Sequence, residues 1–401
     1  MITGNFPVRQ LSAIETPYYY YDMDVLRDTL RVLKQEAAEP NWHVHYAVKA
    51  CATEPIMRTI AGTGIGADCV SGGEIQAAIQ AGFSSENIVF AGVAKSDSEI
   101  RYALEQDIFC FNVESTEELS VISQMAVCLG QLARVCLRVN PNVDAHTHAK
   151  ITTGLKENKF GISLNTLPQA VEMACSLPNI CFLGLHFHIG SQITDMMPFA
   201  QLAERINQLV ADVEQLSCRP VIQHINVGGG LGILYEHPNH FPIPDFKGYF
   251  DTWRTHLHLR PDQHLHFELG RSIVAQCGNL ITRVLYVKKG DNKQFAIVDA
   301  GMNDLLRPAL YGAFHRVENL TRPDAPEQLY DIVGPICESS DVFVENYTMA
   351  RVQRGDILAM RSAGAYGEIM ASQYNLRRLP GHIISDALIQ QGIDKEYTIK
   401  N

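Results

Sequence analysis

Short apolar segments alternate with longer stretches of helical spacing between about residue 43 and residue 271. Eight segments have the bulky, alternating character of strands: HVHYAV, GIGADCV, NIVFAG, IFCFNV, RVCLRVN, CFLGLHFH, HINVGG and HLHFEL. Several intervening segments, such as MMPFAQLAERINQLVADVEQL, have the apolar spacing of an amphipathic helix. This order predicts a parallel sheet with helices packed outside it, and eight strands favour a (β/α)8 barrel. The alternative, an open doubly wound sheet, would need a glycine-rich phosphate turn where the chain reads VKACATEP.

The pattern changes after residue 272. NLITRVLYVKKGDNKQFAIVDAG, DIVGPICESSDVFVENYTMA and RVQRGDILAMRSAGAYG are β-rich and are interrupted by turn residues. They predict a second, mostly antiparallel β domain, to which FPVRQL near the N-terminus is expected to add a strand. We therefore expect an α/β protein with a barrel over residues 20–271 and a β-sandwich or β-barrel domain formed by residues 1–19 and 272–401.

Polar residues and glycines follow the predicted barrel strands where the C-terminal ends would meet. Lys49 ends the first strand, His188 ends the sixth, glycines 228–230 follow the seventh, and the eighth ends with Glu268, followed by Gly270 and Arg271. Barrel enzymes build their active sites at this end, so these groups are expected to converge.

Each of these groups has a structural and a chemical interpretation. A strand-end lysine usually reaches solvent, but a desolvated Lys49 could hold a carbonyl substrate or pyridoxal 5′-phosphate (PLP) as a Schiff base. Gly228, Gly229 and Gly230 could form a flexible turn or an anion cradle of backbone N–H groups. A carboxylate at Glu268 could keep the PLP pyridine nitrogen protonated, or could simply pair with Arg271.

Histidines recur in H-x-H pairs at 43/45, 146/148, 186/188, 256/258 and 264/266. Residues i and i+2 of a strand share a face, so each pair could bind a metal, and a metal-dependent barrel hydrolase is an alternative. The eighth strand ends in ELGR and supplies no aspartate, so we expect no metal.

Two further clusters fall in the β domain. Pro308 could open a helical turn that places Arg307 and Tyr311 on one face, a pair suited to a carboxylate. In GPICESSD, the Cys337 thiol could donate a proton and is followed by Glu338, although most cysteines are buried and inert.

Composition narrows the class of partner. The chain has 401 residues, and its net charge of −11 argues against nucleic acid as a main partner. Neither a signal peptide nor a membrane-spanning apolar run is apparent. The ten cysteines form no C-x-x-C pair, as expected for reduced thiols in the cytoplasm.

Eight motifs, in order, resemble those of the diaminopimelate decarboxylases, which are PLP-dependent enzymes with an alanine-racemase-like barrel. They are YAVKA, ITTGLKENKFGI, HFHIGSQI, NVGGGLGI, FELGR, RPALYGA, GPICESSD and GAYG, and they span almost the whole chain. The chain departs from the family pattern at Cys51, Asn158 and Leu269, which affects loop detail and leaves the functional neighbours in place.

The resemblance implies a role for each position. Lys49 would carry PLP and His188 would stack on its ring. Gly228–Gly230 and the segment Glu268, Leu269, Gly270 and Arg271 would bind the phosphate, with Glu268 on the pyridine nitrogen. Arg271, Arg307 and Tyr311 would hold the distal carboxylate of meso-diaminopimelate, Glu338 its distal ammonium, and Tyr366 would contact cofactor and substrate. Cys337 would deliver the proton and, with Glu338, would serve the neighbouring subunit of a homodimer.

The implied reaction is decarboxylation of meso-2,6-diaminopimelate to L-lysine and carbon dioxide, the last step of lysine biosynthesis. A racemase of the same fold typically has an arginine in place of Glu268, and ornithine-type relatives have aspartate at Glu338. The alternatives are a sibling decarboxylase acting on ornithine, arginine or carboxynorspermidine, and an inactive regulatory homologue, against which the presence of Lys49 and Cys337 argues.

Overall fold

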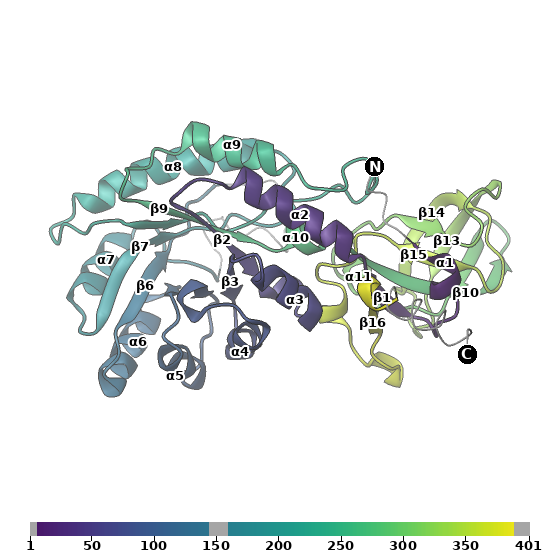
Figure 1. Cartoon of the computed structure of the whole chain (residues 1–401), viewed down its shortest axis with the longest axis horizontal. Coiled ribbons are helices and arrows are strands. Elements are labelled where there is room, and N and C mark those ends of the chain that lie inside the picture. The colour runs from purple at the N-terminus through teal and green to yellow at the C-terminus, as the bar shows by residue number, and fades with distance from the viewer. Residues whose placement is uncertain (1–5, 144–158, 389–401) are drawn as a thin grey trace, which may run out of the picture. The chain divides into compact units, whose positions relative to one another are not determined.

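The structure is a computed structural model that describes residues 6–143 and 159–388, shown in Figure 1. The chain divides into two compact units. The barrel unit contains Leu30–Ile233 and Asp245–Gly270, and the β unit contains Met1–Thr29, Leu234–Pro244 and Arg271–Asn401. The motif ITTGLKENKFGI begins outside the described residues.

The barrel unit is a closed barrel of eight parallel strands, as the sequence predicted. The strands follow one another around the barrel in chain order: β2 (Trp42–Ala47), β3 (Gly66–Cys69), β4 (Ile88–Phe90), β5 (Cys110–Val113), β6 (Ala133–Arg138), β7 (Ile180–His186), β8 (His224–Asn226) and β9 (His264–Leu269). Strand β9 closes the barrel on β2 in a register that places His45 opposite Glu268. This closure brings the ends of the first and last strands together.

Helices surround the barrel strands in Figure 1. They are α2 (Met23–Glu36), α3 (Glu54–Ala61), α4 (Gly72–Ala81), α5 (Asp97–Glu105), α6 (Thr116–Leu129), α7 (Leu167–Ser176), α8 (Met197–Glu214) and α9 (Phe246–His256), with short 3-10 turns at Val48–Ala50 and Ser85–Asn87. Local sequence sets their ends. Ser96 and Glu99 form a capping box at the start of α5, and Gly82 ends α4 in the left-handed conformation at φ 100°.

The β unit is a mostly antiparallel sheet, also as predicted. Its strands are β1 (Tyr18–Tyr21), β10 (Gly278–Lys289), β11 (Gln294–Val298), β12 (Val317–Asn319), β13 (Glu327–Val333), β14 (Val342–Ala350), β15 (Ile357–Met360) and β16 (Gly381–Ile384). The main path is β12-β15-β10-β11-β13-β14, and β1 lies between β10 and β16. Among the described strand pairs of this unit, β11–β13 and β1–β16 are parallel and the others are antiparallel. The unit also contains the short helices α10 (Arg271–Val274) and α11 (Arg307–Tyr311) and 3-10 turns at Glu368–Met370 and Tyr374–Leu376.

The expected strand in FPVRQL was wrong, because this segment forms the short helix α1 (Val8–Leu11). Pro7 starts the turn with φ −72°, and its carbonyl oxygen accepts the Leu11 N–H at 3.0 Å. The N-terminal strand is instead Tyr18–Tyr21, whose alternate residues Tyr18 and Tyr20 pack into the core of the β unit.

The expected domain boundaries differ from the two units in three places, one of which is Arg271, expected in the barrel but part of the β unit. Residues 20–29 belong to the β unit, which contains β1 and its pairings with β10 and β16. Leu234–Pro244 also belongs there, because Tyr235 accepts a hydrogen bond from Arg271, and the Glu236 carbonyl accepts one from Arg316 at 3.4 Å.

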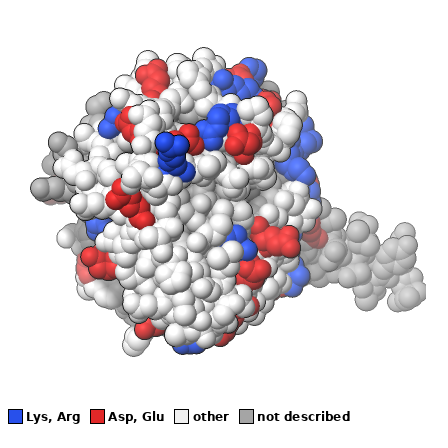
Figure 2. Space-filling model, turned by 90° about the vertical axis from the view of Figure 1, so that its left-hand side faces the viewer, with Lys and Arg blue, Asp and Glu red and all other residues white. Residues whose placement is uncertain are grey.

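Lys and Arg side chains are intermixed with Asp and Glu on the face drawn in Figure 2. Within residues 6–143 and 159–388, no helix combines the length and apolar character that crossing a bilayer requires.

Candidate active site

Lys49 lies directly beyond the C-terminal end of β2, in the turn Val48–Ala50. Its Nζ atom donates to Asp68 Oδ2 at 3.1 Å, and its side chain is 37% exposed while that of Asp68 is fully buried. The turn packs closely against the end of β9, because a Cβ atom at Gly270 would lie 3.0 Å from the Cβ atoms of Ala47 and Ala50. Lys49 thus follows the first barrel strand, as the sequence predicted, and its amine is held by Asp68 while its side chain stays partly exposed.

The pKa of the Asp68 carboxyl group lies close to neutral pH. Burial raises the pKa of its carboxyl to about 7, repulsion from Glu268 adds to the rise, and the nearby Lys49 charge opposes it. The carboxyl group can thus exchange a proton near the working pH of an enzyme, directly beside the Lys49 amine.

Glu268 is held at the inner end of β9 by three side chains from three other strands. Asn112 Nδ2 and Asn226 Nδ2 donate to its Oε1 at 3.0 and 2.8 Å, and His186 Nε2 lies 3.1 Å from its Oε2. Burial alone would raise the pKa of Glu268, but His186 and the Lys49 charge outweigh burial and bring the pKa below its usual range. The carboxylate is therefore buried, oriented and ionised.

His188 lies two residues beyond β7 and is oriented by the glycine segment. Its Nδ1 atom accepts the Gly229 N–H at 3.2 Å, which places the proton of a neutral ring on Nε2. Burial lowers the pKa of His188 well below its ordinary value, and the charges of Arg138 and Lys49 lower it further. The ring is consequently neutral, as stacking on a cationic cofactor ring would favour.

The glycines are required by close packing between strand ends. A Cβ atom at Gly229 would lie 1.9 Å from the Glu268 carbonyl oxygen, and one at Gly228, which has φ 71°, would lie 2.3 Å from the Phe187 carbonyl oxygen. The Gly228 N–H already donates to Asn226 Oδ1 at 2.9 Å, and Gly229 donates to His188. The N–H groups of Gly228 and Gly229 therefore already have hydrogen-bond acceptors within the barrel unit.

The predicted carboxylate-binding residues of the β unit form a cluster of buried cations and aromatic rings. Arg271 and Arg307 are only 6% and 5% exposed. Arg271 Nη1 donates to Tyr235 Oη at 2.7 Å, and its guanidinium lies 4.9 Å from the centroid of the Tyr366 ring. Burial lowers the pKa of Arg271, but the neighbouring tyrosines, Tyr311 among them, outweigh burial and raise it. The predicted helical turn is confirmed as α11, with Pro308 in its first turn.

Cys337 and Glu338 lie elsewhere in the β unit, exposed in the loop between β13 and β14. The Cys337 N–H donates to Asn375 Oδ1 at 3.0 Å. Glu338 accepts hydrogen bonds from Ser340 Oγ at 3.1 Å and from Tyr374 Oη. These partners do not belong to the arginine cluster, so the two residues form a separate, accessible surface.

Four of the five H-x-H pairs lie in the described residues. His186 contacts Glu268, His256 is the last residue of α9, and the pair at 146/148 lies outside the described residues. His43 and His264 contact one another at 2.9 Å between Nε2 and Nδ1. Across residues 6–143 and 159–388, no group of three or more potential ligand side chains has the arrangement of a metal site.

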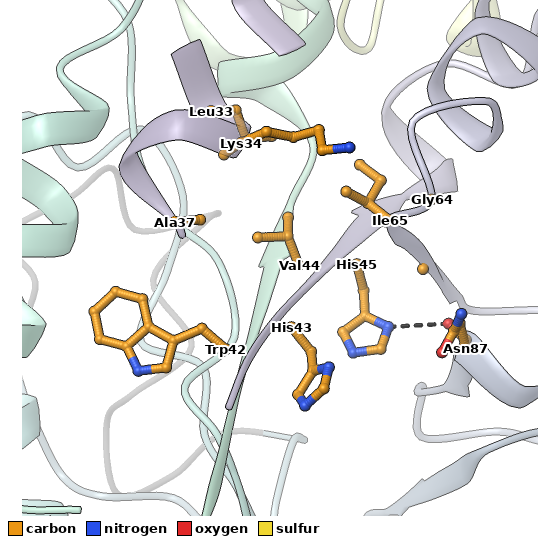
Figure 3. A pocket seen from close by; sticks show the side chains of 11 residues that line it. Leu33, Lys34, Ala37, Trp42, His43, Val44, His45, Gly64, Ile65 and Asn87 are labelled. Carbon is orange, nitrogen blue, oxygen red and sulfur yellow. Dashed lines mark hydrogen bonds between the residues drawn. The ribbon is translucent and has the colours of Figure 1, made fainter. Parts of the chain in front are cut away.

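A cavity of about 170 Å³ lies beside His43. Figure 3 shows the side chains that line it. Trp42, His43 and His45 line it from the start of β2, together with Asn87 before β4. Lys49 follows the opposite end of β2, so this cavity is separate from the predicted active site.

The barrel unit supplies the groups that PLP requires. An aldehyde needs an amine, and Lys49 supplies one; a pyridinium nitrogen needs a carboxylate, and Glu268 is held ionised. The interior also contains buried polar atoms without a hydrogen-bond partner among the described residues, namely Asp68 Oδ1, Asn112 Oδ1 and His186 Nδ1. Such atoms are costly unless a ligand satisfies them, so the residues present fit this cofactor.

The profile of the family "pyridoxal-dependent decarboxylase, pyridoxal binding domain" matches residues 24–275. The chain therefore belongs to the pyridoxal-dependent decarboxylases, and its cofactor is PLP. It is 56% identical over 387 residues to the diaminopimelate decarboxylase of Bacteroides thetaiotaomicron, covering 96% of this chain and 100% of that protein. Within the wider class, the chain is thus a member of the diaminopimelate decarboxylase family.

Solved structures agree with this placement. Diaminopimelate decarboxylase from Helicobacter pylori complexed with L-lysine has a TM-score of 0.88 and 39% identity, covering 94% of this chain and 93% of that chain. A lysine/ornithine decarboxylase from Vibrio vulnificus complexed with putrescine has a TM-score of 0.81 at 22% identity and shares the fold, covering 94% of this chain and 96% of that chain. The likeness to both extends over the barrel and the β unit.

Several residues of the site were missed from the sequence. Asp68, Asn112 and Asn226 surround Glu268 or Lys49, and Tyr235 and His315 contact the arginines. A signal was present for the first three, since each is a polar residue within an apolar strand segment, namely GIGADCV, IFCFNV and HINVGG.

Proposed function

We propose that this protein catalyses the decarboxylation of meso-2,6-diaminopimelate to L-lysine and carbon dioxide, the last step of lysine biosynthesis. Membership of the diaminopimelate decarboxylase family supports the reaction. The substrate is inferred from one observation, the pair of buried guanidinium groups at Arg271 and Arg307. Such a pair suits a second carboxylate, in addition to the one that is lost.

The barrel unit prepares the cofactor for decarboxylation. Loss of carbon dioxide leaves an electron pair on the substrate Cα, and bound PLP supplies a delocalised sink for it when the ring nitrogen is protonated. Glu268 holds that proton in place, because its carboxylate is ionised and fixed by Asn112, Asn226 and His186. Lys49 would provide the covalent attachment, and Asp68 accepts a hydrogen bond from its amine before the cofactor binds.

Other residues position the cofactor. We assign His188 to stack on the ring. Gly228, Gly229 and Gly230, with Leu269, Gly270 and Arg271, are assigned to the phosphate, and Tyr366 to contact with cofactor and substrate. The neutral state of His188 supports its assignment to the ring.

The β unit selects the substrate. L-lysine keeps the carboxylate of the L-centre of meso-diaminopimelate, so the carboxylate that remains must be bound away from the reacting carbon. Arg271, Arg307 and Tyr311 are assigned to it, since a guanidinium matches a carboxylate in shape and charge. Ornithine has no second carboxylate and would leave these buried charges unmatched, which disfavours it as a substrate.

Cys337 is assigned to protonate the carbon from which carbon dioxide departs, and Glu338 to hold the distal ammonium group. Both lie on an exposed loop outside the arginine cluster. This position supports the proposal that they act in the active site of a neighbouring subunit in a homodimer. Mixing Lys49→Ala with Cys337→Ala protein tests this sharing. A randomly re-paired mixture would regain up to about a quarter of wild-type activity, because about half of its dimers are hybrids with one intact site of two. No regain would contradict the sharing.

We place the enzyme in the cytoplasm, without a nucleic-acid or membrane partner. Ten free cysteines and a net charge of −11 support this.

The decisive experiment is an assay of the purified holoenzyme with meso-diaminopimelate, measuring lysine and carbon dioxide, with Lys49→Ala as the inactive control. Ornithine, arginine and carboxynorspermidine are tested in parallel as substrates of sibling decarboxylases. Turnover of ornithine without turnover of diaminopimelate would refute the proposal. The bond between Lys49 and PLP is measured separately by a visible absorption band. Borohydride should abolish this band, and the Lys49→Ala variant should lack it.

A further inference from the structure

Arg307 is held by an imidazole. Arg307 Nη1 lies 2.8 Å from His315 Nε2, and His315 Nδ1 lies 2.9 Å from the Arg361 carbonyl oxygen. A carbonyl can only accept a hydrogen bond, so Nδ1 of His315 must carry the proton, and Nε2 is then left to accept from Arg307. His315 is 3% exposed. Its tautomer and ring orientation are therefore fixed by the backbone.

Tyr235 contacts both arginines. Its Oη atom accepts the hydrogen bond from Arg271, and the Arg307 guanidinium lies 4.9 Å from the centroid of its ring. The His315 ring packs edge-on against it, with the ring centroids 5.0 Å apart. Tyr235 and His315 thus form one rigid pair that sets the position of two guanidinium groups.

The pair holds these cations without neutralising Arg307. Among the residues that the structure describes, no aspartate or glutamate forms an ion pair with Arg307. Burial lowers the pKa of His315 to about 3, and the Arg307 charge contributes to this lowering, so the ring stays neutral. Burial also lowers the pKa of Arg307, as does the neighbouring Arg271. Two mutually repelling buried cations are stable only where an anion completes the site.

We propose that His315 and Tyr235 are positioning residues for the distal carboxylate of the substrate: they orient Arg307 and Arg271 through neutral acceptors and so leave Arg307's charge for that carboxylate. This inference rests on the proposed function and adds to it a cause of substrate specificity. A carboxylate in place of His315 would occupy Arg307 permanently, and a purely apolar residue would leave it unoriented.

The test uses holoenzyme and two ligands that differ by one group. L-lysine carries the retained carboxylate, and cadaverine is the same molecule without it, so the ratio of their dissociation constants isolates carboxylate recognition. The variants are His315→Gln, which keeps a donor and an acceptor, His315→Leu, which keeps neither, and His315→Glu, which introduces a counterion. Calorimetry gives the dissociation constants, and melting temperature and PLP absorbance report folding.

We expect His315→Leu to raise the dissociation constant of L-lysine by about tenfold or more, and His315→Glu to raise it further. The dissociation constant of cadaverine should stay within about twofold of the wild-type value. His315→Gln should restore most of the affinity, and KM for diaminopimelate should follow the L-lysine values more closely than kcat does. Tyr235→Phe should weaken the binding of L-lysine but not that of cadaverine, because this variant loses the hydrogen-bond acceptor for Arg271 and keeps the aromatic ring.

A merely structural role gives a different pattern. If the His315 variants weaken both ligands equally, or leave L-lysine unchanged, the positioning role is refuted even where wild-type enzyme decarboxylates diaminopimelate. If wild-type protein instead binds L-lysine no better than cadaverine and does not turn over diaminopimelate, the proposed function itself fails.

Discussion

Acidification is expected to destabilise the barrel unit through a chain of imidazoles at the N-terminal ends of its strands. His45 Nδ1 contacts the Asn87 carbonyl oxygen at 3.0 Å, drawn as a dashed line in Figure 3. His45 Nε2 contacts His266 Nδ1 at 2.9 Å, and His266 Nε2 contacts His224 Nδ1 at 2.9 Å. Because the carbonyl only accepts, the proton of each neutral ring must lie on Nδ1, and a second proton on His45 or His266 would break a hydrogen bond.

The pKa values give the sign of the effect. Burial lowers the pKa of His45 to about 4 from 6.5, although Glu268 opposes the shift, and burial with repulsion from His264 lowers that of His224 to about 4. The folded state therefore binds protons less readily than the unfolded chain. The stabilisation is complete above pH 6.5 and is lost as the pH falls toward about 4.

The magnitude follows from the same values. Between about pH 7 and pH 5, His45 should cost the folded state about 2 kcal/mol, using about 1.4 kcal/mol per pH unit. His224 is half-buried, so solvent screening reduces its share to about 1 kcal/mol. The sum of about 3 kcal/mol is a substantial part of the 5–15 kcal/mol that is typical of a domain's stability.

Urea titrations at the two pH values measure this loss. The chain has two tryptophans, and both Trp42 and Trp253 lie in the barrel unit, so their fluorescence reports its unfolding. His45→Asn and His224→Asn each remove one titrating ring and keep an amide donor at that position. His258→Asn is the matched control, because His258 is exposed.

The loss of stability between the two pH values should shrink by about 2 kcal/mol in His45→Asn and by about 1 kcal/mol in His224→Asn. The His258 variant should lose as much as wild type. Equal losses in all four proteins would refute the reasoning, because the buried imidazoles would then not be the groups that bind protons on unfolding.

Three further changes test the active site. Glu268→Gln keeps the shape but removes the charge, so kcat should fall by about a hundredfold or more while PLP absorbance remains; an unchanged kcat would contradict the role of the carboxylate. Gly229→Ala should lower PLP content and melting temperature, since its Cβ would lie 1.9 Å from the Glu268 carbonyl oxygen, whereas Gly82→Ala, with nothing within 4 Å, should strain only its own backbone and keep PLP. Cys337→Ala should slow product formation and leave PLP bound, and loss of PLP would show that its role is misassigned.

The barrel and its strand ends were predictable because they depend on local patterns. Eight apolar segments of strand length, separated by helical spacing, correspond one for one to β2–β9. The position of Lys49 followed from the end of the first segment. FPVRQL failed because its apolar pattern fits a strand as well as a short helix, and Pro7 decides between them through its fixed φ.

The charge state of Glu268 was not predictable in the same way, because it is set across strands. Its hydrogen-bond partners lie 156, 82 and 42 residues away, on β5, β7 and β8. Position along one strand therefore identifies the carboxylate but not what keeps it ionised. A general signal still exists: Asp68, Asn112 and Asn226 are polar, belong to barrel strands and are at most 3% exposed. A buried polar side chain must find a partner, and inside a closed barrel such partners are each other or a ligand, so inward polar residues on different strands should be interpreted together as one site.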